Sequence, residues 1–188
     1  QAAYSLTTGG YNSSLGHKAL YYNEAGTSAV AIGSNAGFMF GRGGHSAEGS
    51  IFLGSAAGYY ATGSHNVFIG YESGKGSASS TPYSSGENNI GMGYRSLNSF
   101  TSGDDNIALG YQALNAVTTG HSNVVVGSSA GDTITTGTQN VLVGKDAGGG
   151  SNMAAHSDNV FIGHQAGQSN NASENTFVGH QSGYNTTT

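Results

Sequence analysis

The chain of 188 residues contains 33 glycines and one proline, and only 8% of its residues are charged. Its net charge of -5, with 5 Lys and Arg in all, argues against nucleic acid and against an anionic membrane surface, since both attract clustered positive charge. The absence of Cys excludes disulfides and thiolate zinc sites, and no apolar run approaches the about 20 residues of a membrane-inserted helix.

One short phrase recurs along the whole chain: Asn, an apolar residue, any residue, an apolar residue and a glycine, which we call the anchor glycine. In chain order, looser copies end at Gly16, Gly33 and Gly54, a clear copy spans 66–70, a looser one ends at Gly93, and clear copies span 106–110, 123–127, 140–144, 159–163 and 175–179. The anchor glycines are therefore Gly16, Gly33, Gly54, Gly70, Gly93, Gly110, Gly127, Gly144, Gly163 and Gly179.

The spacing of the anchor glycines indicates the fold class. Successive anchors are most often 17 residues apart, which is too short for helical-hairpin repeats of about 33 residues. The apolar runs are short, rich in Val, Ile and Phe, and bounded by Gly and Asn, as strands are. The sequence therefore predicts an all-β fold, a parallel β-solenoid (β-roll) of about ten coils of ~17 residues, forming a single domain over residues 1–188.

Strand alternation divides each phrase into two faces. We expect the residues three and one before the anchor to fill the interior, as in Val67 and Ile69, Ile107 and Leu109, Val124 and Val126, and Val160 and Ile162. A small residue three after the anchor suits a narrow interior; examples are Ala113, Ala130, Ala147, Ala166 and Ser182. The anchor glycine is expected to take a conformation that a Cβ would forbid. A second glycine, seven before the anchor in most coils, indicates the opposite turn.

The asparagine column predicts a ladder of stacked amides that satisfies backbone groups at a turn, as Asn ladders do in cross-β stacks. Its members are Asn66, Asn89, Asn106, Asn123, Asn140, Asn159 and Asn175.

The central residue of each phrase is expected to point outward, and it is apolar in most coils. A column of ten such residues would be on the order of 48 Å long, and an apolar stripe of that length usually marks an interface. The sequence thus predicts an oligomer that buries Phe52, Phe68, Val125, Leu142, Phe161 and Phe177. The alternative is that these residues lie inside a flattened single-chain roll.

The stretch from Gly110 to Asn115, Gly-Tyr-Gln-Ala-Leu-Asn, followed by Thr-Thr-Gly and the next phrase, resembles repeats of bacteriophage tail-fibre proteins. The phrase with Ala or Val in the middle is also similar to the head repeats of trimeric autotransporter adhesins, whose chains form left-handed parallel β-rolls. These resemblances imply a homotrimer on a virion tail, outside the cell or at its surface. The adhesin unit is usually shorter, which favours the viral family. Such fibres often end in a self-cleaving chaperone domain, so we expect that it was removed or that the chain is a fragment.

Three insertions break the 17-residue spacing: 38–49, 75–87 and 149–157. Their side chains could touch a host cell-surface glycan or protein, and Arg42, His45 and Tyr83 are the candidate contacts because aromatic faces and hydrogen-bond donors suit sugars. The alternative is that these are plain surface loops.

Enzyme, metal and cofactor chemistry is not indicated. His17, His164 and His180 occupy the position after an anchor, where Tyr71 and Tyr94 also occur, so this position is interpreted as a surface position whose histidines stack between coils. The adjacent acids Asp104 and Asp105 precede Asn106 in an expected turn, where such acids are usually solvated.

The predicted function is a structural or receptor-binding segment of an extracellular trimeric fibre, most readily a viral tail fibre. One alternative is a bacterial trimeric surface adhesin head. Another is an ice-binding solenoid, motivated by hydroxyl residues eight before the anchor and interrupted by Ala25, Ala155 and Asn171. The hydroxyl residues of this column are Thr8, Thr62, Ser85, Ser102, Thr119 and Thr136.

Overall fold

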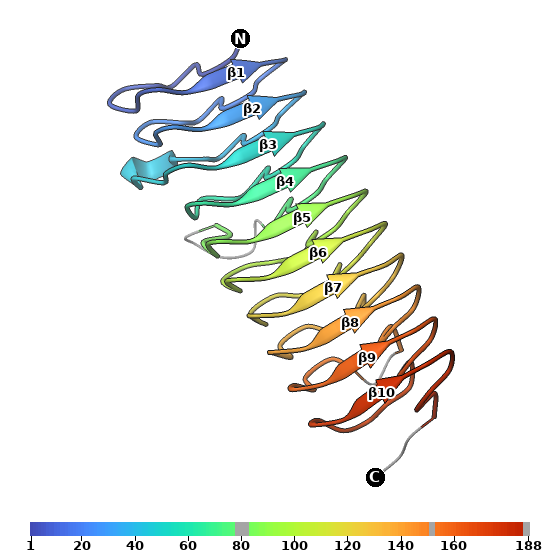
Figure 1. Ribbon diagram of the computed structural model, residues 1–188. Helices are drawn as coiled ribbons and strands as arrows, with labels where there is room; N and C mark the ends of the chain where they lie inside the picture. Colours follow the sequence, from blue (N-terminus) through green and yellow to red (C-terminus); the bar gives the residue numbers. More distant parts are fainter. Residues whose placement is uncertain (78–82, 151–152, 186–188) are drawn as a thin grey trace.

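The computed structural model describes residues 1–77, 83–150 and 153–185, and within them the chain winds into a parallel β-solenoid (Figure 1). In these ranges ten strands form one parallel sheet in sequence order, with one short 3-10 helix, η1 (Arg42–Gly44). The strands are β1 (Ser13–Leu15), β2 (Val30–Ile32), β3 (Ile51–Leu53), β4 (Val67–Ile69), β5 (Ile90–Met92), β6 (Ile107–Leu109), β7 (Val124–Val126), β8 (Val141–Val143), β9 (Val160–Ile162) and β10 (Thr176–Val178). The predicted all-β parallel solenoid is confirmed.

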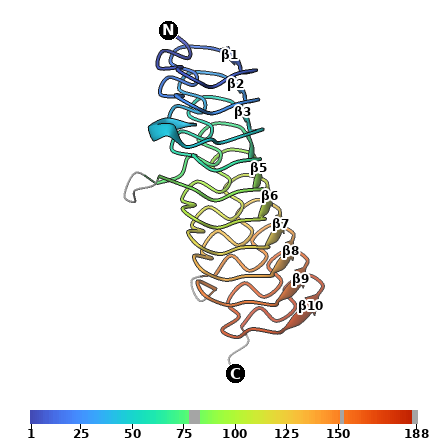
Figure 2. The same cartoon turned by 90° about the vertical axis from the view of Figure 1, so that its left-hand side faces the viewer.

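The pairing register places equivalent positions of the phrase side by side. Phe52 of β3 lies opposite Phe68 of β4, and Val125 of β7 lies opposite Leu142 of β8. Because every coil repeats this register, the strands follow one another up one side of the column while the turns form the remainder (Figure 2). The first and last strands, β1 and β10, lie at opposite ends of the column (Figure 1).

The anchor glycines explain why the coils stack so closely. Gly110 has a φ of 141°, and a Cβ added to it would lie 2.5 Å from the carbonyl oxygen of Gly127 in the next coil. A Cβ at this position would overlap the carbonyl oxygen, and a residue with a side chain is also strained at this φ. At every other anchor from Gly16 to Gly163, an added Cβ would likewise collide with the anchor glycine of the next coil. The predicted role of the anchors is therefore confirmed.

The asparagine column forms the predicted ladder inside the protein. Asn123 donates its backbone N–H (3.1 Å) and its side-chain amide (2.9 Å) to Oδ1 of Asn106, and the same amide reaches the carbonyl oxygen of Gly137 at 3.0 Å. Asn140 bonds to Asn123 in turn, at 3.0 Å through both groups. Asn123 is fully buried, so the ladder satisfies polar backbone groups that water cannot reach.

The central residues of the strands point inward, which corrects the predicted oligomer interface. Five of the six predicted interface residues are 0% exposed, and the sixth, Phe177, is partly buried against the same core. The five are Phe52, Phe68, Val125, Leu142 and Phe161. The alternative, that these side chains lie inside a single-chain roll, is the arrangement that the structure adopts.

The flanking residues of each strand point outward, although they were predicted to fill the interior. This correction applies to Val67, Ile69, Ile107, Leu109, Val124, Val126, Val160 and Ile162, which are half-buried or exposed while the residue between each pair is buried. The physical reason is the width of the coil. Each three-residue strand faces a turn that lies so close that one side chain per strand fills the space between them.

In most coils a large side chain at one of two interior positions is matched by a small residue at the other. Where the strand supplies a large side chain, the residue four after the anchor is glycine, as in Phe68 with Gly74. Where the strand supplies a small one, that residue is leucine in three coils of four, as in Ala108 with Leu114. The exception is the coil of Ala31, which has Gly37 at that position and buries Phe40 nearby. The small residue three after the anchor also faces inward, as predicted; Ala113 and Ala130 are both fully buried.

Candidate functional site: an apolar sheet face and a polar pocket

The outer face of the sheet consists of the two flanking residues of each strand, and all of these except Ser13 and Thr176 are apolar. Ile32 is 44% exposed, Met92 is 40% exposed and Ile162 is 41% exposed. Apolar side chains line this face from β1 to β10, and no other part of the chain covers them among the described residues. A continuous apolar surface of this length is typical of an interaction site.

Two rims border the outer face. The rim after the anchors contains Tyr71, Tyr94 and Tyr111, whose rings stack with centroids 5.5 and 5.2 Å apart. His164 and His180 stack on the same rim at 5.2 Å, as predicted. The other rim, five before the anchors, is mostly polar: Tyr11, Ser28, Gly49, His65, Asn88, Asp105, Ser122, Gln139, Asp158 and Glu174. An apolar centre with a largely polar border is the usual composition of a protein interface.

Two of the predicted glycan contacts meet, although they are 41 residues apart in the chain. Arg42 donates from Nη1 to the Tyr83 hydroxyl at 2.7 Å, and its guanidinium lies 5.0 Å from the Tyr22 ring and 5.3 Å from the Tyr83 ring. The Tyr60 ring stacks on Tyr83 at 5.9 Å. This cluster ties the insertion at 38–49 to the insertion at 75–87, of which 78–82 lie outside the described residues.

An aromatic ladder that the sequence reasoning missed runs beside this cluster. Tyr4, Tyr21, Phe38 and Tyr59 stack in succession, with centroids 5.1, 5.6 and 4.6 Å apart. Burial, followed by the neighbouring tyrosines, raises the pKa of the Tyr59 hydroxyl. The signal was present, because the fifth residue after each of the first three anchors is aromatic.

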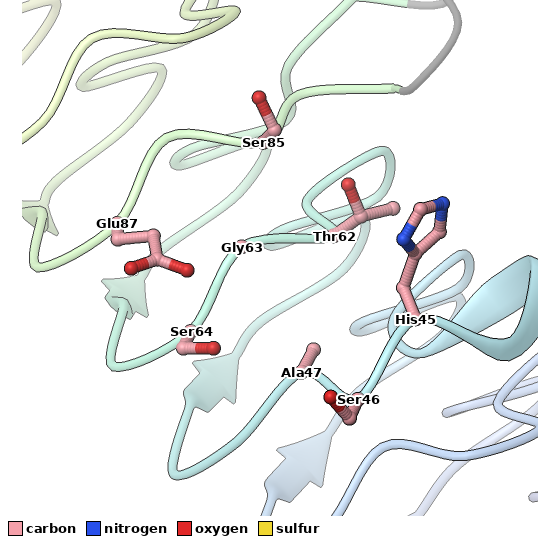
Figure 3. Close-up of a pocket in the computed structure, with 8 residues that line it drawn as sticks. All are labelled: His45, Ser46, Ala47, Thr62, Gly63, Ser64, Ser85 and Glu87. Atoms are coloured by element: carbon pink, nitrogen blue, oxygen red, sulfur yellow. The ribbon is translucent and has the colours of Figure 1, made fainter.

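His45, the third predicted contact, does not join the cluster of Arg42 and Tyr83 but lines a pocket of about 240 Å³ (Figure 3). The remaining lining residues are Ser46, Ala47, Thr62, Gly63, Ser64, Ser85 and Glu87. The pocket lies across the turns of three neighbouring coils, and the close-up shows the side chains of Thr62 and His45 near one another at one end.

Two acids with shifted pKa values, Glu72 and Asp132, interact with charged residues of neighbouring coils. Burial alone would raise the pKa of Glu72, but Lys75 at 2.8 Å and Arg95 at 2.7 Å lower it overall by hydrogen bonding and charge. Burial, and then the nearby charge of Asp146, raises the pKa of Asp132 to about 6. The Oδ1 atom of Asp132 is buried without a hydrogen-bond partner among the described residues.

The remaining sequence candidates are dispersed. Asp104 accepts the backbone N–H of Glu87 at 2.7 Å, while Asp105 is exposed on the rim, so the two acids form no shared site. In the column proposed for ice binding, Thr62 is buried and Ser85 is half-buried, which breaks the exposed array. Within the described ranges, no group of three or more His, Asp or Glu residues is arranged to hold a metal ion.

The fold and the outer face define a β-solenoid repeat protein with an uncovered apolar sheet face. Among the described residues, no helix has the length and apolar character needed to cross a bilayer. Comparison with protein-family models, curated proteins and solved structures finds no match.

Proposed function

We propose that this protein is a structural and receptor-binding segment of an extracellular trimeric fibre, and specifically of a viral tail fibre. The observation that carries the proposal is the uncovered apolar face of the sheet, bordered by two rims and repeated in every coil. A soluble monomer rarely exposes an apolar surface of this extent, and only 8% of the residues are charged to keep such a surface from associating.

A second copy of the chain is the partner that this face fits best. Its apolar rows repeat once per coil, at the strand spacing of about 4.8 Å, so another parallel copy presents matching rows along the full length. With both rims included, the face measures about 45 by 20 Å, or on the order of 900 Å² per chain, which is comparable to a standard interface of about 800 Å² per partner.

The number of chains follows from the resemblance of the repeats to tail fibres and adhesin heads, both of which are trimeric. A trimer places three outer faces around one axis, where each face contacts two neighbours. The location on a virion tail, outside the cell or on its surface, belongs to the same proposal.

The experiment that tests assembly is the mass of the chain in solution, measured by light scattering after size-exclusion chromatography. We expect three times the mass of the 18.9 kDa chain at all concentrations measured. A monodisperse monomer would contradict the proposal. Flanking sequence tests the viral assignment: a chaperone or baseplate-attachment domain supports it, whereas a downstream membrane anchor assigns the chain to a bacterial surface adhesin.

A further inference from the structure

The pocket of Figure 3 occurs where two insertions meet the column. The coils between Gly33 and Gly54 and between Gly70 and Gly93 span 21 and 23 residues, against the usual 17. His45 and Ser46 come from the end of the first insertion, and Ser85 and Glu87 come from the end of the second. The turn that carries Thr62 and Ser64 lies between them.

The backbone around the pocket is held firmly by bonds between coils. The N–H of Glu48 donates to Oγ of Ser64 at 3.3 Å, and the N–H of Thr62 donates to the carbonyl oxygen of Ser84 at 2.8 Å. Beyond the pocket, the hydrogen bond from Arg42 to Tyr83 joins the two insertions. The walls are therefore preorganised, which reduces the entropy cost of binding a ligand.

Several polar side chains in the pocket remain available. Among the described residues, the imidazole of His45, the carboxylate of Glu87 and the hydroxyl of Ser85 have no hydrogen bond or ion pair to the rest of the chain. The hydroxyl of Ser64 accepts one bond and can still donate. Donors and acceptors thus converge on one open, mostly polar space.

We propose that this pocket binds one ring of a neutral or amino sugar, an inference that rests on the proposed role of the fibre in attachment. Hydroxyl, imidazole and carboxylate groups pair with the many hydroxyls of a sugar, and a carboxylate accepts two of them at once. The volume of about 240 Å³ lies below the range of about 300–1,000 Å³ that holds drug-sized ligands, so it suits a single ring.

The charge of Glu87 selects among sugars. Its carboxylate repels sialic acid and other anionic sugars and attracts the ammonium of an amino sugar. Glu87 is also the only carboxylate among the residues that line the pocket, whereas hydrolysis of a glycosidic bond usually requires two. The site therefore binds its sugar without cleaving it.

The test uses the full chain and saturation-transfer NMR with methyl glucoside, methyl galactoside, N-acetylglucosamine, glucosamine and sialic acid. We expect signals from at least one neutral or amino sugar and none from sialic acid. Glu87→Gln keeps the shape but loses the charge, and should weaken binding about tenfold, because hydrogen bonds to an ionised acceptor are stronger than those to a neutral one. His45→Gln is a second variant with the same expected direction.

Glu24→Gln is the matched control because Glu24 is a half-buried acid that neither lines the pocket nor lies on the outer face or its rims, and it should bind as the wild type does. The absence of any sugar signal from the wild type, a preference for sialic acid, or equal binding by Glu87→Gln would overturn the inference. A trimer that binds none of these sugars refutes this site alone. A monomer that binds them through Glu87 refutes the fibre proposal and leaves the site standing.

Discussion

Phe68 occupies the space that the missing side chain of Gly74 leaves open in the same coil. A Cβ built on Gly74 would lie 2.2 Å from Cγ of Phe68, and Gly74 has a φ of 54°. We expect Gly74→Ala to destabilise the protein by roughly 2–4 kcal/mol, from overpacking of about 1–3 kcal/mol and a left-handed backbone cost of about 1 kcal/mol. Urea denaturation measures the change.

Gly10→Ala is the control for this substitution, because a Cβ at Gly10 would have no atom within 4 Å. Its stability should stay within about 0.5 kcal/mol of the wild type, as for surface changes in general. Equal effects of the two substitutions would show that the interior is not filled in the way described.

The matching of large and small interior residues can be tested by building the pair of one coil, Phe68 with Gly74, into the coil that contains Ala108 and Leu114. Ala108→Phe alone should overpack its coil at a cost of about 1–3 kcal/mol, and Leu114→Gly alone should leave a cavity that costs about 2–5 kcal/mol. The double variant recreates the arrangement of Phe68 and Gly74 and should recover at least about 1 kcal/mol of the summed loss. A double-mutant cycle in urea measures this coupling; strict additivity would refute the matching of sizes.

The asparagine ladder predicts that replacing Asn by Ala lowers the stability of the fold by different amounts at Asn123 and at Asn175. Asn123→Ala removes the acceptor for Asn140 and the donor to the carbonyl oxygen of Gly137, leaving at least two buried polar groups unpaired. The cost should be about 2–6 kcal/mol, at about 1–3 kcal/mol for each of two groups. Asn175→Ala, at the exposed end, loses a bond to the carbonyl oxygen of Ser173 and should cost about 1 kcal/mol. Thermal melts followed by circular dichroism compare them.

The outer face gives a prediction about assembly. Val124 lies at its centre and is 36% exposed in the single chain. Val124→Lys would bury an unpaired charge in every subunit, so the variant should elute as a monomer while keeping the wild-type circular dichroism spectrum. Thr119→Lys, at an exposed position outside the face and its rims, should keep the wild-type mass. Unchanged mass for Val124→Lys would mean that the chains associate through another surface.

Asp132 predicts a pH dependence with a definite sign. Burial and Asp146 raise its folded pKa to about 6 from 3.8, so the folded state holds its proton over a range in which the unfolded chain has released it. The contribution of this group to stability is complete below about pH 4 and is lost as the pH rises through 6. The melting temperature of Asp132→Asn minus that of the wild type should therefore increase as the pH rises from about 4 to about 7. Asp158→Asn, an exposed rim acid, is the matched control, and a gap that narrows with rising pH would contradict the assignment.

The sequence predicted the coil period, the parallel register and the roles of the anchor glycines and of Asn123, because each depends on a residue type that recurs at a fixed position. It did not determine which strand face is buried. Both Phe68 and its neighbours Val67 and Ile69 are apolar, and alternation separates two faces without saying which one points inward. The deciding signal was the inverse relation of size between Phe68 and Gly74.

The contact between Arg42 and Tyr83 could not be predicted, because it depends on the paths of two insertions that share no repeat position. The pocket that contains His45 and Glu87 depends on the same paths. Irregular segments carry no periodic pattern, so the repeat that fixes the rest of the chain says nothing about where their side chains lie.

The hydrogen bonds between neighbouring coils run along the column, and the coils of β1 and β10 lie at its opposite ends (Figure 1). A force that pulls the first and last coils apart therefore acts on the coils in series, so that every coil carries the same tension. The force at which the column yields is set by its weakest layer, whatever the number of layers. Adding coils would extend the reach by about 4.8 Å each with little change in tensile strength.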